Sequence, residues 1–138
     1  MSIKVIAFDV YGTILCSIDP ENCMPPRKGF LEFARKCIAD GIVLVTSSDS
    51  STDLLKIDLE ESGVPLEIFT DFYPMEKLQP KYFDPILDFF GIKPCELYVF
   101  GNVFELDIEP ALKLGCGAKL VPSYDSGKDD FDWTLVSF

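Results

Sequence analysis

The stretch that decides the fold lies at residues 3–15 and reads IKVIAFDVYGTIL. It begins with a short apolar run without polar alternation, which is typical of a strand buried on both faces of a parallel sheet. The run ends abruptly at Asp9, and Gly12 and Thr13 follow it, as expected for a tight turn. Such an aspartate either caps the turn or performs chemistry at the end of the strand.

Four further apolar runs repeat this pattern along the chain, at residues 42–46, 66–70, 97–100 and 118–121. Between them, apolar residues recur at helical spacing, and glycine ends the helices. Because strands that alternate with helices favour right-handed parallel crossovers, the sequence predicts an α/β fold, a three-layer sandwich around a Rossmann-like parallel sheet of five strands. We expect residues 1–138 to form a single domain, with 133–138 as an optional edge strand and the acidic segment 125–132 as a solvated loop.

Composition argues against several classes of function. The chain has 138 residues and a net charge of −11, which disfavours nucleic acid and anionic membranes as partners. No apolar stretch approaches the roughly 18 residues of a membrane span, and the N-terminus lacks the pattern of a signal peptide. The five cysteines form no C-x-x-C pair and histidine is absent, so we expect reduced thiols, a cytoplasmic location and no Cys–His nucleophile.

Polar residues follow the predicted strands, at the sheet edge where folds of this kind place their ligands. Asp9 follows the first strand, Thr46 ends the second, and Lys77 lies beyond the third. Asn102 and Asp107 follow the fourth. An aspartate can accept a phosphoryl group, carboxylates can hold Mg²⁺, and an ammonium with a hydroxyl can stabilise phosphate oxygens. These residue types therefore indicate a site for phosphate and metal.

In these positions the chain resembles the haloacid dehalogenase-like (HAD) superfamily of hydrolases, through four motifs in order that cover nearly the whole chain. The motifs read FDVYGTIL, IVLVTSS, KLQPKYF and VFGNVFELDIEPALKLG. The resemblance implies that Asp9 is the nucleophile and that Thr46 and Lys77 complete the catalytic set. It also implies that phosphate is bound by Thr46, Ser47, Lys77 and Gly12, and that Mg²⁺ is bound by Asp9, the backbone carbonyl of Tyr11, Asn102 and Asp107.

Two positions depart from the pattern of the phosphatases in this family. Tyr11 stands where they have an aspartate that protonates the leaving group and then activates water, and a phenol is a poor base at neutral pH. Asn102 stands where they have a metal-binding aspartate, which leaves one negative charge fewer for Mg²⁺. The D-x-Y-G-T form resembles the 2-haloacid dehalogenase branch, but neither Arg27 nor Arg35 lies in a motif that matches the halide-binding arginine of that branch.

The cap domain of many family members has no room in this sequence. The stretch between Leu15 and Val43, about half of which a helix occupies, is too short for a small domain, and so is the stretch between Thr70 and Lys77. We therefore expect a site that is open to solvent unless a second copy of the chain, in a homo-oligomer, covers it.

The sequence leaves three functions open. The first is a Mg²⁺-dependent phosphatase or phosphotransferase that forms an aspartyl-phosphate on Asp9. It would act on a phosphorylated small molecule or macromolecule and favour leaving groups that need no proton. The second is a HAD-fold binding or interaction protein that has lost catalysis, and the third is a 2-haloacid dehalogenase-like hydrolase. Purely structural roles also stay open, with Asp9 as a turn cap, Lys77 as a surface lysine and Asp107 as a helix N-cap.

Overall fold

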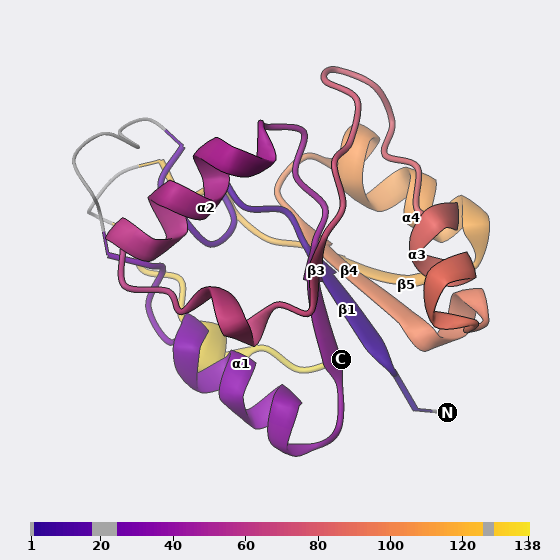
Figure 1. Ribbon diagram of the computed structural model, residues 1–138, viewed down its shortest axis with the longest axis horizontal. Coiled ribbons are helices and arrows are strands. Elements are labelled where there is room, and N and C mark those ends of the chain that lie inside the picture. Colours follow the sequence, from indigo (N-terminus) through magenta and orange to yellow (C-terminus); the bar gives the residue numbers. More distant parts are fainter. Residues whose placement is uncertain (1, 18–24, 126–128) are drawn as a thin grey trace.

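One parallel sheet organises the computed structural model, which describes residues 2–17, 25–125 and 129–138 (Figure 1). Its five strands are β1 (Val5–Phe8), β2 (Val43–Thr46), β3 (Asp71–Phe72), β4 (Leu97–Gly101) and β5 (Gly117–Leu120). They are arranged in the order β3-β2-β1-β4-β5, and every pairing is parallel. The predicted α/β fold with a five-stranded parallel sheet is confirmed.

Helices cover both faces of the sheet, as Figure 1 shows. Helices α1 (Phe30–Ala39) and α2 (Thr52–Glu61) pack on one face, where alternate residues of β1, Ile6 and Phe8, point. Helices α3 (Asp84–Phe90) and α4 (Glu109–Leu114) pack on the other face, against Val5 and Ala7. The strands are buried on both faces, which explains their unbroken apolar character.

The core beneath α1 is built from aromatic rings. The ring of Phe8 lies 5.3 Å from that of Phe30 and 5.6 Å from those of Phe100 and Trp133, measured between centroids. Trp133 is fully buried. Fully burying a large apolar side chain contributes about 1.5–3 kcal/mol, so the C-terminal segment is an integral part of this core.

The edge strand expected at residues 133–138 is not present. Instead, Trp133–Leu135 forms a short 3-10 turn (η5), and the residues after it form no strand. The reason is the Trp133 ring, which inserts between α1 and the sheet and turns the segment across the face of the sheet. The segment therefore packs against α1 and does not extend the sheet at an edge.

Residues 126–128 of the acidic segment 125–132 lie outside the described ranges, and the described part of that segment is only partly solvated. Arg27 is fully buried, and its guanidinium donates two hydrogen bonds of 2.9 Å to the carboxylate of Asp129. The same guanidinium lies 4.3 Å from the ring centroid of Phe131, at the distance of a cation–π contact. This ion pair joins the C-terminal segment to the loop that leaves β1.

The prediction of a strand at residues 66–70 is wrong, because the strand of this region lies after these residues and is shorter. Leu66–Ile68 forms a 3-10 turn (η2), and the strand itself is only Asp71–Phe72, which pairs with Val45 and Thr46. Leu66 and Ile68 pack against the core on the α1 side. Their apolar character therefore reflects burial in a turn and not an extended conformation.

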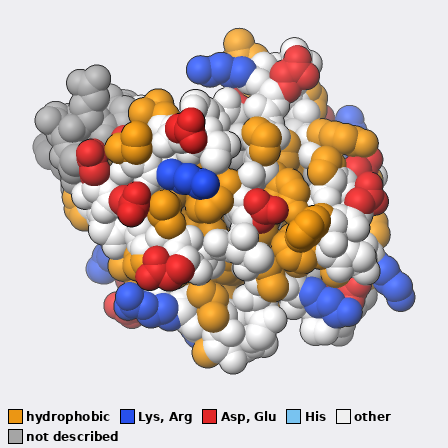
Figure 2. Space-filling model, viewed as in Figure 1, with side chains coloured by type: hydrophobic (Ala, Val, Ile, Leu, Met, Phe, Trp, Pro, Cys, Tyr) orange, Lys and Arg blue, Asp and Glu red, His pale blue; other side chains and the backbone are white. Residues whose placement is uncertain are grey.

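The described connections from β1 to α1 and from β3 to α3 contain no helix or strand that could build a cap domain. No helix in the described part of the chain is long and apolar enough to cross a membrane. On the face shown in Figure 2, lysine and arginine side chains are scattered among acidic and hydrophobic ones. That the chain binds neither nucleic acid nor membrane stays a prediction.

Candidate active site

Asp9 lies where the three central strands end together. The register aligns Phe8 with Thr46 of β2 and with Phe100 of β4. The Asp9 N–H donates to the carbonyl of Phe100 at 3.0 Å, and the Ser47 N–H donates to the carbonyl of Phe8 at 2.8 Å. The backbone that carries Asp9 is therefore fixed from both sides at the carboxyl edge of the sheet.

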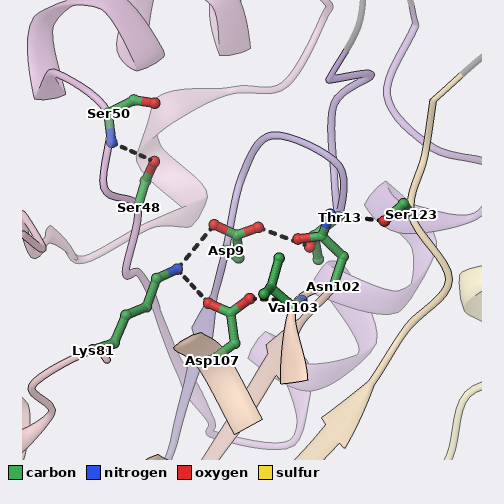
Figure 3. Close-up of polar contacts among 9 residues, drawn as sticks. All are labelled: Asp9, Thr13, Ser48, Ser50, Lys81, Asn102, Val103, Asp107 and Ser123. Carbon is green, nitrogen blue, oxygen red and sulfur yellow. Dashed lines mark hydrogen bonds and ion pairs between the residues drawn. The ribbon is translucent and has the colours of Figure 1, made fainter. Parts of the chain in front are cut away.

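A buried lysine lies between two buried aspartates at this edge (Figure 3). The Nζ of Lys81 lies 2.9 Å from Oδ1 of Asp9 and 2.6 Å from Oδ1 of Asp107. The second oxygen of Asp9 accepts a hydrogen bond of 3.1 Å from the hydroxyl of Thr13. Both oxygens of Asp9 are thus oriented by protein groups, which preorganises the carboxylate for attack.

Burial and neighbouring charges set the protonation of this group of residues. Burial raises the pKa of Asp9 to about 6, the charge of Lys81 lowers it, and the charge of Asp107 raises it. For Lys81, burial lowers the pKa, but the two carboxylates outweigh burial and the net direction is upward. Lys81 is therefore a permanent cation between its partners, and Asp9 is ionised at neutral pH.

The lysine that contacts Asp9 is Lys81. The third motif predicted Lys77 for this place, and that prediction is wrong. Lys77 is exposed on a turn, whereas the backbone N–H of Lys81 donates to the carbonyl of Leu106 at 2.9 Å. That bond holds Lys81 against the segment that carries Asp107. Both lysines lie in the motif KLQPKYF. The one feature of the sequence that could have favoured Lys81 is that it lies nearer to the start of α3.

A π-helical turn, Phe104–Ile108 (η4), brings Asp107 back to the end of β4. Within it, one carboxylate oxygen of Asp107 accepts a hydrogen bond of 3.1 Å from the N–H of Val103. A side chain on Gly101 would collide with Asp107, so glycine is needed at that position. Helix α4 begins only at Glu109, so Asp107 is not its N-cap. Single π turns are frequent at functional sites.

Tyr11 is held away from acid–base chemistry. Its hydroxyl donates a short hydrogen bond to the carboxylate of Asp58 in α2. Burial, followed by the hydrogen bond and the negative charge of Asp58, raises the pKa of Tyr11 above its ordinary value. Tyr11 therefore stays neutral, and its hydroxyl hydrogen is already used in the hydrogen bond to Asp58.

Asn102 lies over Gly12 at the other side of the site. Its amide nitrogen donates to the hydroxyl of Ser123 at 3.0 Å, which leaves its carbonyl oxygen as an acceptor. Gly12 has a φ of +85°, and a side chain there would collide with the Asn102 amide. The close approach of the two loops therefore requires glycine at position 12.

The hydroxyls of Thr46 and Ser47 are buried and have no hydrogen-bond partner in the described part of the chain. A buried polar group without a partner costs about 1–3 kcal/mol, so these hydroxyls are donors that a bound ligand could satisfy. Neither side chain lines the cavity at Asp9. Their phosphate-binding role stays a prediction.

A cavity of about 190 Å³ opens at Asp9. It brings together four residues that the sequence predicted, namely Asp9, Tyr11, Asn102 and Asp107. It adds two charged residues that the prediction did not include, Lys81 and Asp49, and the apolar residues Val103 and Leu106.

The oxygen ligands in this cavity suit a weakly held divalent cation. In the described ranges, no group of three or more histidine, cysteine, aspartate and glutamate side chains could hold a metal. A metal would therefore rely on the carboxylates of Asp9 and Asp107, the side-chain carbonyl of Asn102 and the backbone carbonyl of Tyr11. Mg²⁺ accepts oxygen ligands of this kind and keeps several waters, so the ligand set fits that ion. The ammonium of Lys81 competes for the same two carboxylates, which should weaken binding.

Neither a family model nor a curated protein matches the sequence. Solved structures match the fold. A protein described as a predicted phosphoglycolate phosphatase from Haemophilus somnus matches with a TM-score of 0.74 and 15% identity, covering 92% of this chain and 89% of its own. A HAD family enzyme from Bacteroides thetaiotaomicron, solved with magnesium and inorganic phosphate, matches with a TM-score of 0.69 and 14% identity, covering 92% and 98%.

A third solved structure belongs to the other branch that the first motif resembles. L-2-haloacid dehalogenase from Xanthobacter autotrophicus matches with a TM-score of 0.71 and 11% identity, covering 86% of this chain and 77% of its own. The chain therefore has the HAD-like fold, as its four motifs predicted. Phosphatases and a dehalogenase share that fold, so the activity has to be argued from the residues of the site.

Proposed function

We propose that this protein is a Mg²⁺-dependent phosphatase or phosphotransferase in which Asp9 is the nucleophile. The observation that carries the proposal is the orientation of the Asp9 carboxylate by Lys81 and Thr13 in an open cavity at the end of β1. A turn cap would need no buried lysine, whereas a nucleophile needs an oriented, ionised oxygen.

Phosphoryl transfer would begin with attack of an Asp9 oxygen on phosphorus. The bond from phosphorus to the leaving group then breaks, and an aspartyl-phosphate is formed. Lys81 is close enough to Asp9 to stabilise the charge that develops on the phosphoryl oxygens. Thr46 and Ser47 do not line this cavity, so this step is assigned to Asp9 and Lys81 alone.

The charge of the site supports a role for the metal. Asp9 and Asp107 carry two negative charges against the single positive charge of Lys81. A phosphate dianion would therefore meet a site with a net negative charge, which repels it. Mg²⁺, when bound by Asp9, Asp107, Asn102 and the Tyr11 carbonyl, supplies the positive charge that offsets this repulsion. The magnesium and phosphate in the Bacteroides thetaiotaomicron enzyme support this assignment.

Tyr11 limits which leaving groups can depart with its help. Because its hydroxyl donates a hydrogen bond to Asp58 and its pKa is raised, Tyr11 does not protonate a leaving oxygen. Either another residue supplies that proton, or the leaving group departs as a stable anion, as in acyl phosphates and activated aryl phosphates.

The experiment that tests the nucleophile uses dinitrophenyl phosphate with Mg²⁺, because its leaving group needs no proton. Asp9→Asn keeps the shape of the side chain and removes the attacking charge, so turnover should fall by at least about a thousandfold. Asp53→Asn removes an exposed carboxylate of α2 and should retain full activity. Equal turnover in Asp9→Asn and the unchanged protein would sink the assignment of Asp9.

Dehalogenation is the second candidate function. The hydrogen bond from Tyr11 to Asp58 favours it, because that bond keeps Tyr11 from supplying a proton and a halide leaves without one. In this reaction Asp9 would displace halide from carbon, and no metal would be needed. Chloride release from a 2-haloacid in the presence of a chelator would support it. If neither substrate is turned over, both enzymatic candidates fail, and the binding or interaction role that the sequence left open becomes the one to test.

A further inference from the structure

Asp49 is a half-buried carboxylate in the wall of the cavity that contains Asp9. It lies just after β2, on the loop that follows Thr46. In the described residues, no hydrogen bond or ion pair engages its side chain, and no motif of the sequence assigned it a role. Its side chain is partly exposed, so solvent reaches it.

The other ionisable groups of this cavity are already engaged. Asp9 and Asp107 share the ammonium of Lys81. The hydroxyl of Tyr11 donates a hydrogen bond to Asp58. Asp49 is therefore the ionisable side chain of this lining that has no partner in the described residues.

The loop that carries Asp49 is fixed on both sides of it. The carbonyl of Ser48 accepts a hydrogen bond of 3.0 Å from the N–H of Met75, and the hydroxyl of Ser48 accepts one of 3.1 Å from the N–H of Ser50. In the view of Figure 3, Ser48 and Ser50 lie on the opposite side of Asp9 from Thr13 and Asn102. Asp49, which lies between Ser48 and Ser50 in the sequence, lines the same cavity as Asp9.

We propose that Asp49 is the general acid and base of this site, taking the role that Tyr11 cannot fill. The inference rests on the proposed function, because it assumes phosphoryl transfer through Asp9. It changes the expected substrate class from activated phosphates alone to ordinary phosphate monoesters, whose leaving alcohol or phenol needs a proton.

The proton balance of the two steps is complete with Asp49 alone. In the first step Asp9 attacks phosphorus, the bond to the leaving oxygen breaks, and protonated Asp49 gives its proton to that oxygen. In the second step the ionised Asp49 takes a proton from water, whose oxygen attacks phosphorus. The bond from phosphorus to Asp9 then breaks, which releases phosphate and returns Asp9 as a carboxylate and Asp49 as an acid.

The test compares kcat/KM of the unchanged protein, Asp49→Asn and the control Asp53→Asn on dinitrophenyl phosphate and on phenyl phosphate. For both substrates, kcat/KM reports formation of the aspartyl-phosphate. Asp49→Asn should lower kcat/KM for phenyl phosphate by roughly 100-fold or more, the usual contribution of a general acid. For dinitrophenyl phosphate the same variant should lie within about threefold of the unchanged protein, because that leaving group needs no proton.

The second step gives an independent readout. Without a base for water, Asp49→Asn should accumulate phosphorylated Asp9 during turnover of dinitrophenyl phosphate. Intact-protein mass spectrometry after an acid quench detects the added phosphoryl group. Asp53→Asn and the unchanged protein should show much less of it, and Asp49→Glu should restore part of the rate.

Each outcome decides the inference. An equal loss on both substrates would give Asp49 a positioning role only, and no loss on either would remove it from the mechanism. If the unchanged protein turns over neither substrate, the proposed function has failed and the inference falls with it. Thermal melting of all variants shows that the differences do not come from unfolding.

Discussion

Replacing Asp9 by asparagine should make the folded protein more stable at neutral pH, although it removes the proposed nucleophile. Burial raises the pKa of Asp9 from 3.8 to about 6, even with Lys81 beside it. When the pKa of a group is higher in the folded protein than in the unfolded chain, protonation of that group favours the folded state. This stabilisation is fully present at pH values below the pKa of the unfolded state, and it is lost as the pH rises through the pKa of the folded state. The shift corresponds to about 3 kcal/mol at neutral pH, since one pKa unit is about 1.4 kcal/mol.

Asparagine does not titrate, so Asp9→Asn should escape this loss. The difference in the free energy of unfolding between Asp9→Asn and the unchanged protein should therefore grow by about 3 kcal/mol between about pH 3 and pH 7. Lys81 keeps Asp107 as its partner in the variant. Guanidinium titrations across this pH range, with a chelator present, measure the difference.

The matched control is again Asp53→Asn, which removes one exposed carboxylate. Its effect on the free energy of unfolding should stay within about 0.5 kcal/mol at every pH. A stability difference for Asp9→Asn that does not change with pH would refute the reasoning. So would greater stability of the unchanged protein at neutral pH, because both results mean that burial does not penalise the Asp9 charge.

Three further predictions concern the buried charges and the aromatic core. Lys81→Met should abolish turnover and lower the free energy of unfolding, measured by urea titration, by about 3–5 kcal/mol, because two buried carboxylates lose their shared cation. Its control is Lys77→Met, at an exposed position, which should change the free energy of unfolding by less than about 0.5 kcal/mol in a matching urea titration. Asp129→Asn should cost about 3–5 kcal/mol by leaving the guanidinium of Arg27 buried without its counter-charge, and a loss below about 1 kcal/mol in chemical denaturation would contradict this. Trp133→Ala should lower the free energy of unfolding by about 3–5 kcal/mol. Unfolding has to be monitored by circular dichroism, because the variant lacks the chain's only tryptophan and therefore its fluorescence signal. Near-unchanged stability would mean that the Trp133 ring is not in the core.

The sheet could be predicted from the sequence wherever a strand is buried on both faces. The predicted runs at residues 3–8, 42–46, 97–100 and 118–121 each overlap an observed strand. The run at residues 66–70 could not be read in the same way, because a turn that packs on the core is as apolar as a strand. Periodicity alone does not separate these two cases.

The site could be predicted only as far as its residues follow strands directly. Asp9 and Asn102 come directly after β1 and β4, and the structure places both in one cavity with Asp107. Lys81 was missed because its place depends on the hydrogen bond to Leu106, a contact between distant segments. Asp58 was missed for a similar reason, because only the packing of α2 brings it to Tyr11.

The position of Trp133 has a consequence for synthesis of the chain. The ring of Phe8 in β1 contacts the ring of Trp133, which is made much later during translation. The side of the sheet under α1 therefore cannot close until Trp133 has left the ribosome. Until then the nascent chain exposes Phe8, Phe30 and Phe100, and contacts of such long sequence separation form slowly. We expect a chaperone to bind this aromatic face during translation and to leave it once Trp133 has emerged.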